Sequence, residues 1–280
     1  MKNSKNILRR LARVFTVLAL AAGLLCACGP RPEPASDSAT ELPVILVGSD
    51  SYPPFNYLDA DGAPTGIDVE LATEAFQRMG YRAQFVTIDW ENKKELVESG
   101  QIDCIWGSFS MDDRENEYNW AGPYMASYQV VAVRTNSEIY TLKDLEDKTL
   151  VVQSTTKPEA LFLDHADPRL PQLRALYSLQ DRDLIYTTLI KGYADALAAH
   201  ETAIQQFMED YSVEYRVLDE PLQVVGLGVA FAKADTRGLD RQLTRVFAQM
   251  RADGTLQAIL GRYLDDPQHY LEPLEVNGDD

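Results

Sequence analysis

The chain has 280 residues, 45% of them hydrophobic, which suits one large or two modest α/β domains and excludes a wholly disordered protein. It carries 26 basic and 43 acidic residues, for a formal net charge of −17. A chain this acidic is not expected to bind nucleic acid or an anionic membrane surface.

The first 28 residues have the pattern of an export signal. Five of the 26 basic residues lie in the first thirteen positions, and the apolar run at 14–25 is too short to span a bilayer. The run ends in Leu25-Cys26-Ala27-Cys28-Gly29, which resembles a bacterial lipobox with Cys28 as the lipidated residue, because small Ala27 precedes it. The alternative is an ordinary cleaved signal that contains cysteines.

We therefore expect residues 1–28 to be a lipoprotein signal peptide with its lipidated cysteine. Residues 29–42 contain too few apolar side chains to pack and should form a flexible tether. The protein would be exported and anchored by lipid to the outer face of the cytoplasmic membrane. The remaining cysteine, Cys104, would be a small buried hydrophobic residue.

The first folded part predicts alternating strands and helices. A strand at 44–47 leads into Tyr52-Pro53-Pro54-Phe55, where two prolines fix an extended loop and leave the aromatic rings projecting. Apolar residues at helical spacing predict a helix over 67–79 with Asp68 as its N-cap. A strand at 84–88, a helix at 91–99 and an apolar strand at 104–106 follow.

The stretch after that strand offers hydrogen-bond donors. The apolar run ends at Gly107, and Ser108, Ser110 and Arg114 follow it. Backbone N–H groups, hydroxyls and a guanidinium are what a carboxylate needs when it leaves water, so the stretch indicates a receptor for a small anion. The alternative for Arg114 is a solvated ion pair with its acidic neighbours.

The second part repeats the pattern. Gly192-Tyr193-Ala194-Asp195 leads into an apolar run at 196–199, as Gly100-Gln101-Ile102-Asp103 leads into 104–106, which suggests two lobes of one βα design. The other elements expected after residue 124 are strands at 129–134, 150–153, near 176 and at 227–232, and helices at 157–163, 181–191, 201–210, 239–251 and 256–264.

Taken together, these motifs resemble the extracytoplasmic solute-binding proteins of amino-acid ABC transporters, over about 43–264. In chain order they are Tyr52-Pro53-Pro54-Phe55, Gly66-Ile67-Asp68-Val69-Glu70-Leu71, Gly100-Gln101-Ile102-Asp103, Ser108 to Arg114, Gly122-Pro123-Tyr124, Leu142-Lys143-Asp144-Leu145, Gln153-Ser154-Thr155-Thr156, Ala194-Asp195-Ala196 and Gly254-Thr255. The resemblance implies an α/β, two-lobed type II periplasmic-binding fold with two hinge-crossing strands and a ligand cleft. The first lobe would comprise 43–134 and 224–267, the second 135–223, and 268–280 would form a C-terminal tail.

The resemblance also implies roles for ligand-binding residues. Tyr52 would lie against the ligand with Trp90 facing it, and Ser108 and Ser110 would hold the ammonium and carboxylate groups, with Arg114 as the carboxylate clamp. At a helix N-terminus in the second lobe the anion would meet Ser154, Thr155 and Thr156. The aromatic residues could instead be core residues, and the three hydroxyl residues could be simple helix caps.

Two positions depart from the family pattern. The spacing from Ser110 to Arg114 is one residue shorter than usual, and the aspartate expected for the ligand ammonium is replaced by His200. We hypothesise that Glu201 takes over the anionic role, while His200 hydrogen-bonds the ligand or orients Glu201. The alternative is that Glu201 only favours the first turn of its helix.

The sequence therefore predicts a monomeric, lipid-anchored binding protein that captures a small amino acid or related carboxylate and delivers it to an ABC permease, without a cofactor or metal. One alternative is an enzyme on the same fold, such as a prephenate-type dehydratase with Glu201 or His200 as general acid. The other is an extracytoplasmic sensor. No nucleophile with a partnered base and no metal-ligand spacing among the three histidines is visible, so binding is favoured over catalysis.

Overall fold

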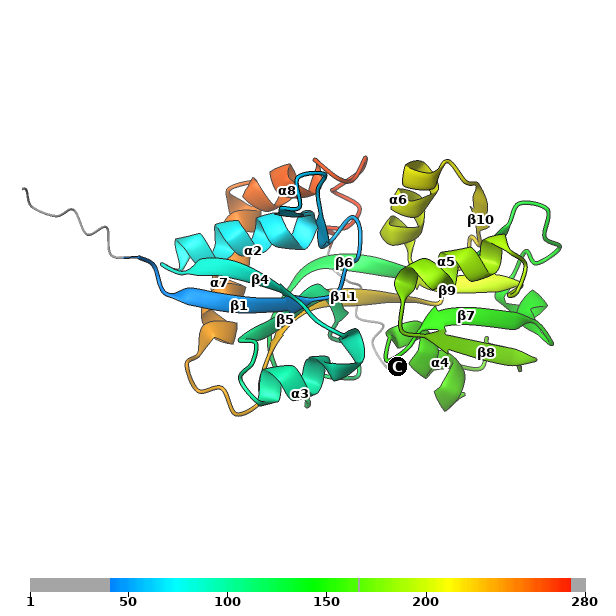
Figure 1. Cartoon of the computed structure of the whole chain (residues 1–280), viewed down its shortest axis with the longest axis horizontal. Coiled ribbons are helices and arrows are strands. Elements are labelled where there is room, and N and C mark those ends of the chain that lie inside the picture. Colours follow the sequence, from blue (N-terminus) through cyan, green and yellow to red (C-terminus); the bar gives the residue numbers. More distant parts are fainter. Residues whose placement is uncertain (1–40, 166, 273–280) are drawn as a thin grey trace, which may run out of the picture. The chain divides into compact units, whose positions relative to one another are not determined.

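The computed structural model describes residues 41–165 and 167–272, and the compact unit begins at Leu42 (Figure 1). The predicted signal peptide, Cys28 and nearly all of the tether lie outside the described residues, as does 273–280 of the expected tail. Among the helices that the structure describes, none has the length and apolar character needed to cross a membrane.

Eleven strands are found in the described part of the chain. They are β1 (Val44–Ser49), β2 (Tyr57–Leu58), β3 (Pro64–Thr65), β4 (Arg82–Thr87), β5 (Cys104–Ser110), β6 (Asn119–Arg134), β7 (Thr149–Gln153), β8 (Ala175–Leu179), β9 (Ala196–His200), β10 (Tyr215–Val217) and β11 (Gln223–Phe231). Nine of them form one sheet in the order β4-β1-β5-β11-β6-β9-β7-β8, with β10 also pairing with β6, and β2 pairs with β3.

Helices connect the strands. They are α2 (Ile67–Arg78), α3 (Lys93–Glu98), α4 (Lys157–Asp164), α5 (Arg182–Ile190), α6 (Glu201–Tyr211), α7 (Leu239–Ala252) and α8 (Thr255–Leu260), with short 3₁₀ turns η1 (Trp90–Asn92) and η2 (Leu142–Leu145). The fold is thus mixed α/β, with parallel pairing of β1 to β4 and β5 in one lobe and of β7 to β8 and β9 in the other.

In the first lobe, helices pack on both faces of β4, β1 and β5 (Figure 1). The larger core joins the apolar faces of α2, α7 and α8 to Val47 and Trp106. A smaller core on the opposite face includes Val97 of α3 with Ile105 and Phe109. Alternate residues of β5 therefore serve different cores, as the two-residue period of a strand requires.

The second lobe uses the same principle. Val131 and Val133 of β6 pack with Phe162 of α4, whereas Val130 and Ala132 pack on the opposite face with residues of α5 and α6. Both faces of this part of the sheet are therefore buried.

The aspartates that end the two repeated motifs, Gly100 to Asp103 and Gly192 to Asp195, make equivalent hydrogen bonds in the structure. Asp103 Oδ2 accepts a hydrogen bond from the backbone N–H of Leu46 at the start of the neighbouring strand, at 2.8 Å. Asp195 Oδ2 accepts one from the N–H of Thr149, also at 2.8 Å. In each lobe this carboxylate joins the beginnings of two parallel strands, so the two motifs perform the same task.

Two strands connect the lobes. β6 pairs with β11 as far as Gln129, and from Gln129 onward it pairs with β9. The change of partner therefore falls inside β6, a few residues before the expected lobe boundary at 134. The strand is longer than the predicted segment at 129–134, because its first part is held by pairing with a distant strand.

Three local expectations differ from the structure. β5 continues through Gly107 to Ser110 because β11 pairs with it up to Ser110. The N-cap of α2 is Gly66, at φ 118°, where any side chain would collide with the Phe55 carbonyl. Asp68 is instead buried inside the helix. At the other end of the chain, Tyr270 and Leu271 of the expected tail belong to the first-lobe core.

Candidate functional site

A cleft lies between the two lobes, and its empty space, which includes a part open to solvent, is about 500 Å³. It is lined from the first lobe by residues at or after the carboxyl ends of β1, β4 and β5, and from the second lobe by residues near the ends of β7 and β9 and on the first turns of α5. Carboxyl ends of parallel strands are where ligands bind in open α/β sheets. The topology therefore places both sets of loops against one space.

Eight of the ten expected site residues line this cleft. They are Tyr52, Trp90, Ser108, Ser110, Arg114, Thr155, Thr156 and His200. Ser154 and Glu201 do not line it. Ser154 is buried beside the cleft, and Glu201 begins α6 and accepts a hydrogen bond from the Tyr270 hydroxyl at 3.4 Å. The ammonium role expected for Glu201 therefore has no geometric support.

Ser108 is held in an unusual backbone conformation. Its φ is 51°, which is uncommon for a residue with a side chain, and the β5–β11 register shifts opposite it. Its N–H donates to Asp68 Oδ2 at 2.7 Å, and the other carboxylate oxygen of Asp68 accepts from the Tyr124 hydroxyl at 2.8 Å. Burial raises the pKa of Asp68 to about 7. The Ser108 amide is thus occupied, and its hydroxyl faces the cleft without a partner among the described residues.

Arg114 reaches across the cleft. Its Nη1 donates to the Ser110 carbonyl at 3.3 Å and its Nη2 to the Thr155 carbonyl of the second lobe at 3.5 Å. The acidic residues near it, Asp113 and Glu117, pair with Lys157 and Lys94 instead. The guanidinium is therefore not neutralised by a carboxylate in the described part of the chain, which disfavours the surface ion-pair interpretation.

The start of α4 supplies the second-lobe side. Thr156 is the N-cap residue, but its hydroxyl donates to the Gln153 carbonyl at 2.6 Å rather than accepting from the helix. The N–H of Thr155 donates to the Glu159 carboxylate at 2.6 Å. The Lys157 ammonium bonds the Asp113 carboxylate of the first lobe. Both threonines face the cleft, and this helix start is in contact with the first lobe.

His200 occupies a buried polar position. Its ring lies 2.7 Å from the Ser127 hydroxyl and within 3.0 Å of the Gln129 amide nitrogen, and its backbone N–H donates to the Tyr52 hydroxyl at 3.3 Å. Burial, and next the charge of Arg182, lower the pKa of His200 to about 3. The imidazole is neutral at physiological pH, so His200 supplies no charge to the cleft.

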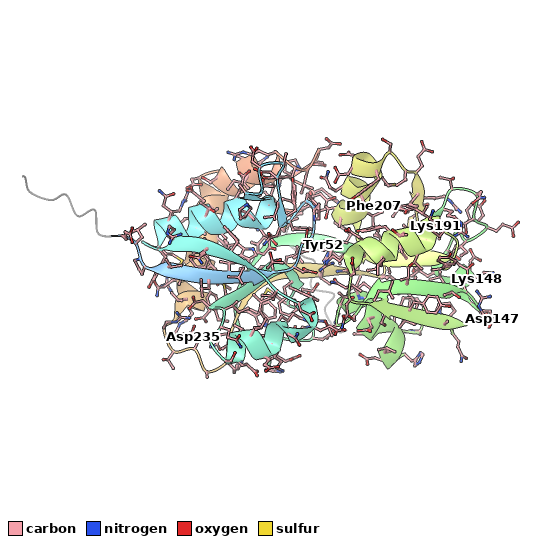
Figure 2. All side chains as sticks on the ribbon, viewed as in Figure 1. Tyr52, Asp147, Lys148, Lys191, Phe207 and Asp235 are labelled. Carbon is pink, nitrogen blue, oxygen red and sulfur yellow. The ribbon has the colours of Figure 1, made fainter. Side chains whose placement is uncertain are left out.

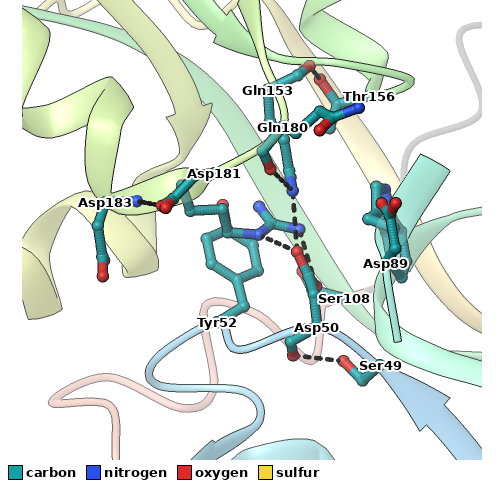
Figure 3. A network of polar contacts seen from close by, with 12 residues as sticks. Ser49, Asp50, Tyr52, Asp89, Ser108, Gln153, Thr156, Gln180, Asp181 and Asp183 are labelled. Carbon is teal, nitrogen blue, oxygen red and sulfur yellow. Dashed lines mark hydrogen bonds and ion pairs between the residues drawn. The ribbon is translucent and has the colours of Figure 1, made fainter. Parts of the chain in front are cut away.

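Three further residues form a polar network that sequence reasoning did not assign (Figure 3). Arg182 Nε donates to Asp50 Oδ2 at 2.8 Å, and the Gln153 amide donates to the same oxygen at 2.8 Å. Gln153 stands in a motif noted above, and Asp50 precedes the Tyr52 motif. Arg182 is the first residue of α5. Charged residues are common in the helices of this chain, so its sequence context does not indicate that it faces a cleft.

Comparison with known proteins identifies the family. Residues 44–266 match the bacterial extracellular solute-binding proteins, family 3. The chain belongs to this family. The histidine-binding periplasmic protein of Salmonella typhimurium is 30% identical over 231 residues, covering 79% of this chain and 87% of the relative. The glutamate-binding protein GluB of Corynebacterium glutamicum is 24% identical and covers 96% of this chain and 95% of its own.

A solved structure supports the same family. The substrate-binding protein of an ABC uptake transporter from Streptococcus pneumoniae, with bound histidine, is 26% identical, with a TM-score of 0.73 over 79% of this chain and 92% of that protein. The two-lobed α/β fold expected from the sequence is thereby confirmed. Family membership makes this chain an extracytoplasmic solute-binding protein.

The cleft of this solute-binding protein contains several buried polar atoms without partners among the described residues. They are the Ser108 hydroxyl, the side-chain Oε1 atoms of Gln129 and Gln153, and the Trp90 indole nitrogen. Buried polar groups are nearly always hydrogen-bonded, so unmatched donors and acceptors at a cleft are available to a bound polar ligand. Here they include both kinds, as a ligand with mixed polar groups requires.

Proposed function

We propose that the protein captures a small amino acid or related carboxylate in the interlobe cleft and delivers it to the permease of an ABC importer. The observation that carries the proposal is Arg114, a guanidinium in the cleft with no carboxylate partner among the described residues. Arginine binds a carboxylate in a fixed, bidentate geometry. Two of the relatives are named for the amino acids that they bind, histidine and glutamate.

The cleft has contributions from both lobes, which suits capture by closure. Tyr52, Trp90 and the Ser108 to Arg114 segment come from one lobe, and Thr155, Thr156 and His200 from the other. A ligand that contacts both sets stabilises the closed arrangement, with β6 and β11 as the connections that bend. We place the first crossing at Gln129, where β6 changes partner, and assign residues 130–223 to the second lobe and 43–128 with 224 to at least 271 to the first.

The cellular setting is part of the proposal. The lipobox pattern at Cys28 would anchor the mature chain to the outer face of the cytoplasmic membrane, with 29–42 as tether, next to the permease. We propose that it works as a monomer, because each chain carries a complete two-sided cleft.

A thermal-shift screen of the purified protein against amino acids, polyamines and small carboxylates tests this function. A ligand at 100 times its dissociation constant that binds only the folded state adds about 2.7 kcal/mol of stability. We expect at least one amino acid or carboxylate to stabilise the protein and polyamines to have no effect. Stabilisation by polyamines alone would contradict the proposal.

The same compounds also separate binding from catalysis. Each stabilising compound is incubated with catalytic amounts of protein and followed by mass spectrometry. We expect recovery of the unchanged compound. Multiple turnovers of a substrate would favour an enzyme of the dehydratase type.

A further inference from the structure

Arg182 occupies a position in the cleft that is built to bind a cation. Its guanidinium carbon lies 3.3 Å from the centroid of the Tyr52 ring, and its Nε donates to Asp50 at 2.8 Å. The acidic and aromatic partners come from the first lobe, whereas Arg182 opens α5 in the second. An aromatic face beside a carboxylate is a typical site for a guanidinium or ammonium group. Here the Arg182 side chain of the protein itself fills it.

This pair is largely removed from solvent. The side chains of Arg182 and Asp50 are 11% and 14% exposed. Gln153 also donates to Asp50, so the carboxylate is engaged by two donors from the second lobe. A cationic ligand group could use this site only by displacing Arg182 and leaving a buried guanidinium unpaired, which is costly.

The rest of the cleft carries an excess of positive charge. Its charged lining residues are Arg114, Lys157 and Arg182, and no aspartate or glutamate of the described chain lines it. Lys157 and Arg182 are paired with Asp113 and Asp50. Arg114 has no such partner, and the neutral His200 ring does not change the net charge of the cleft. The cleft is electrostatically complementary to a ligand with net negative charge.

Arg182 also has donors to offer. Its hydrogen bonds within the described chain engage Nε and Nη2, both with Asp50. Nη1 has no acceptor there, although the residue lines the cleft. A guanidinium has five N–H groups in a fixed fork, so part of the fork remains for a ligand acceptor.

We propose that Arg182 is a specificity-determining residue that makes the cleft selective for a net anionic ligand with two carboxylate groups, one bound at Arg114 and the second at Arg182. The ligand class is that of acidic amino acids or plain dicarboxylates. Arg182 excludes cationic amino acids because it already fills the Asp50 and Tyr52 site. This inference rests on the proposed function, since it describes the ligand of the same cleft.

The experiment is isothermal titration calorimetry with three groups of probes: glutamate and aspartate, succinate and 2-oxoglutarate, and arginine and lysine. The wild type should bind a member of the first or second group and neither cationic amino acid. The first two groups distinguish an acidic amino acid from a dicarboxylate without an ammonium group. Arg182→Ala should lower the affinity for the acidic probe at least about tenfold. It should also gain measurable affinity for arginine or lysine, because it empties the site.

Arg216→Ala is the matched control. Arg216 also belongs to the second lobe and stacks on a tyrosine, with its guanidinium carbon 4.0 Å from the Tyr140 centroid, but it does not line the cleft. The Arg216→Ala variant should bind every probe with the affinity of the wild type. Asp50→Asn is the second variant should Arg182→Ala fail to fold. Asp50→Asn keeps Arg182 but removes its counter-charge. The variant should therefore bind the acidic probe more tightly than the wild type and gain no affinity for the cationic amino acids.

The outcomes separate the two proposals. Binding of arginine or lysine by the wild type, or unchanged affinity for the acidic probe in Arg182→Ala, overturns the inference and leaves the proposed function standing. Weaker binding of the acidic probe by Asp50→Asn overturns it as well. If no amino acid or carboxylate binds the wild type, the proposed function fails and this inference fails with it.

Discussion

The ring of Tyr52 and the guanidinium of Arg182 meet across the cleft, with 3.3 Å between the ring centroid and the guanidinium carbon. Other contacts also cross the cleft, from Lys93 and Arg114 to Thr155 and from Lys157 to Asp113. Figure 2 shows Tyr52 near the middle of the fold, where the two lobes meet. Several residues that line the cleft, including Tyr52, Arg114 and Arg182, thus also join the two lobes, so binding and closure should respond to the same substitutions.

Arg114→Ala should weaken binding of the carboxylate ligand at least about tenfold. Loss of one partner of a buried charge pair costs about 2–5 kcal/mol, and each 1.4 kcal/mol is a factor of ten. Calorimetry with the ligand found in the screen measures the effect. Arg262→Ala is the control, because Arg262 is 62% exposed and lies outside the cleft. Equal affinities of Arg114→Ala and the wild type would show that Arg114 does not bind the carboxylate.

Glu201→Gln should leave ligand affinity within about twofold of the wild type. Glu201 accepts a hydrogen bond from Tyr270 and does not line the cleft, so removal of its charge leaves the site intact. Titration of the variant with an amino acid and with its deaminated analogue tests this. A selective loss of affinity for the amino acid would restore Glu201 as the partner of a ligand ammonium.

His200 should make the protein less stable in mild acid. Burial lowers its pKa to about 3 in the folded state, against an ordinary value of 6.5 in the unfolded chain. Between these values the unfolded chain binds a proton that the folded protein does not. The contribution to stability is therefore complete above about pH 6.5 and is lost as the pH falls, by at most about 1.4 kcal/mol per pH unit.

His200→Gln removes this titration while keeping an uncharged polar side chain next to Ser127 and Gln129. Urea unfolding at pH 7.5 and at pH 4.5 gives the difference in unfolding free energy for each protein. That difference should be smaller for His200→Gln than for the wild type. An identical difference in the two proteins would mean that the folded protein binds the proton as readily as the unfolded chain.

Cys28→Ser should release the exported protein from the membrane fraction. Under the proposal, the lipid chains at Cys28 hold the mature chain to the membrane after signal cleavage. Fractionation of cells followed by immunoblotting shows where the protein resides, and Cys26→Ser is the matched control that should remain membrane-bound. Retention of an exported Cys28→Ser protein in the membrane would contradict the anchor.

Local sequence patterns located most secondary-structure elements within a few residues, because apolar periodicity and Gly breaks act over short distances. The predicted helix at 239–251 is observed as Leu239–Ala252, and the predicted strand at 150–153 as Thr149–Gln153. The motifs from Tyr52 to Thr255 were sufficient to predict the family, which the match over residues 44–266 confirms.

By itself, therefore, the sequence determined the family, the alternation of strands and helices, and eight of the residues that line the cleft. Only the tertiary structure decided that Arg182 meets Asp50, 132 positions away in the chain, and that Glu201 turns toward Tyr270. It also decided the length of β6, which is set by pairing with β11 and β9. The physical reason is that such contacts depend on the direction in which each side chain leaves its element and on how the lobes pack. Neither is encoded in the spacing of neighbouring residues.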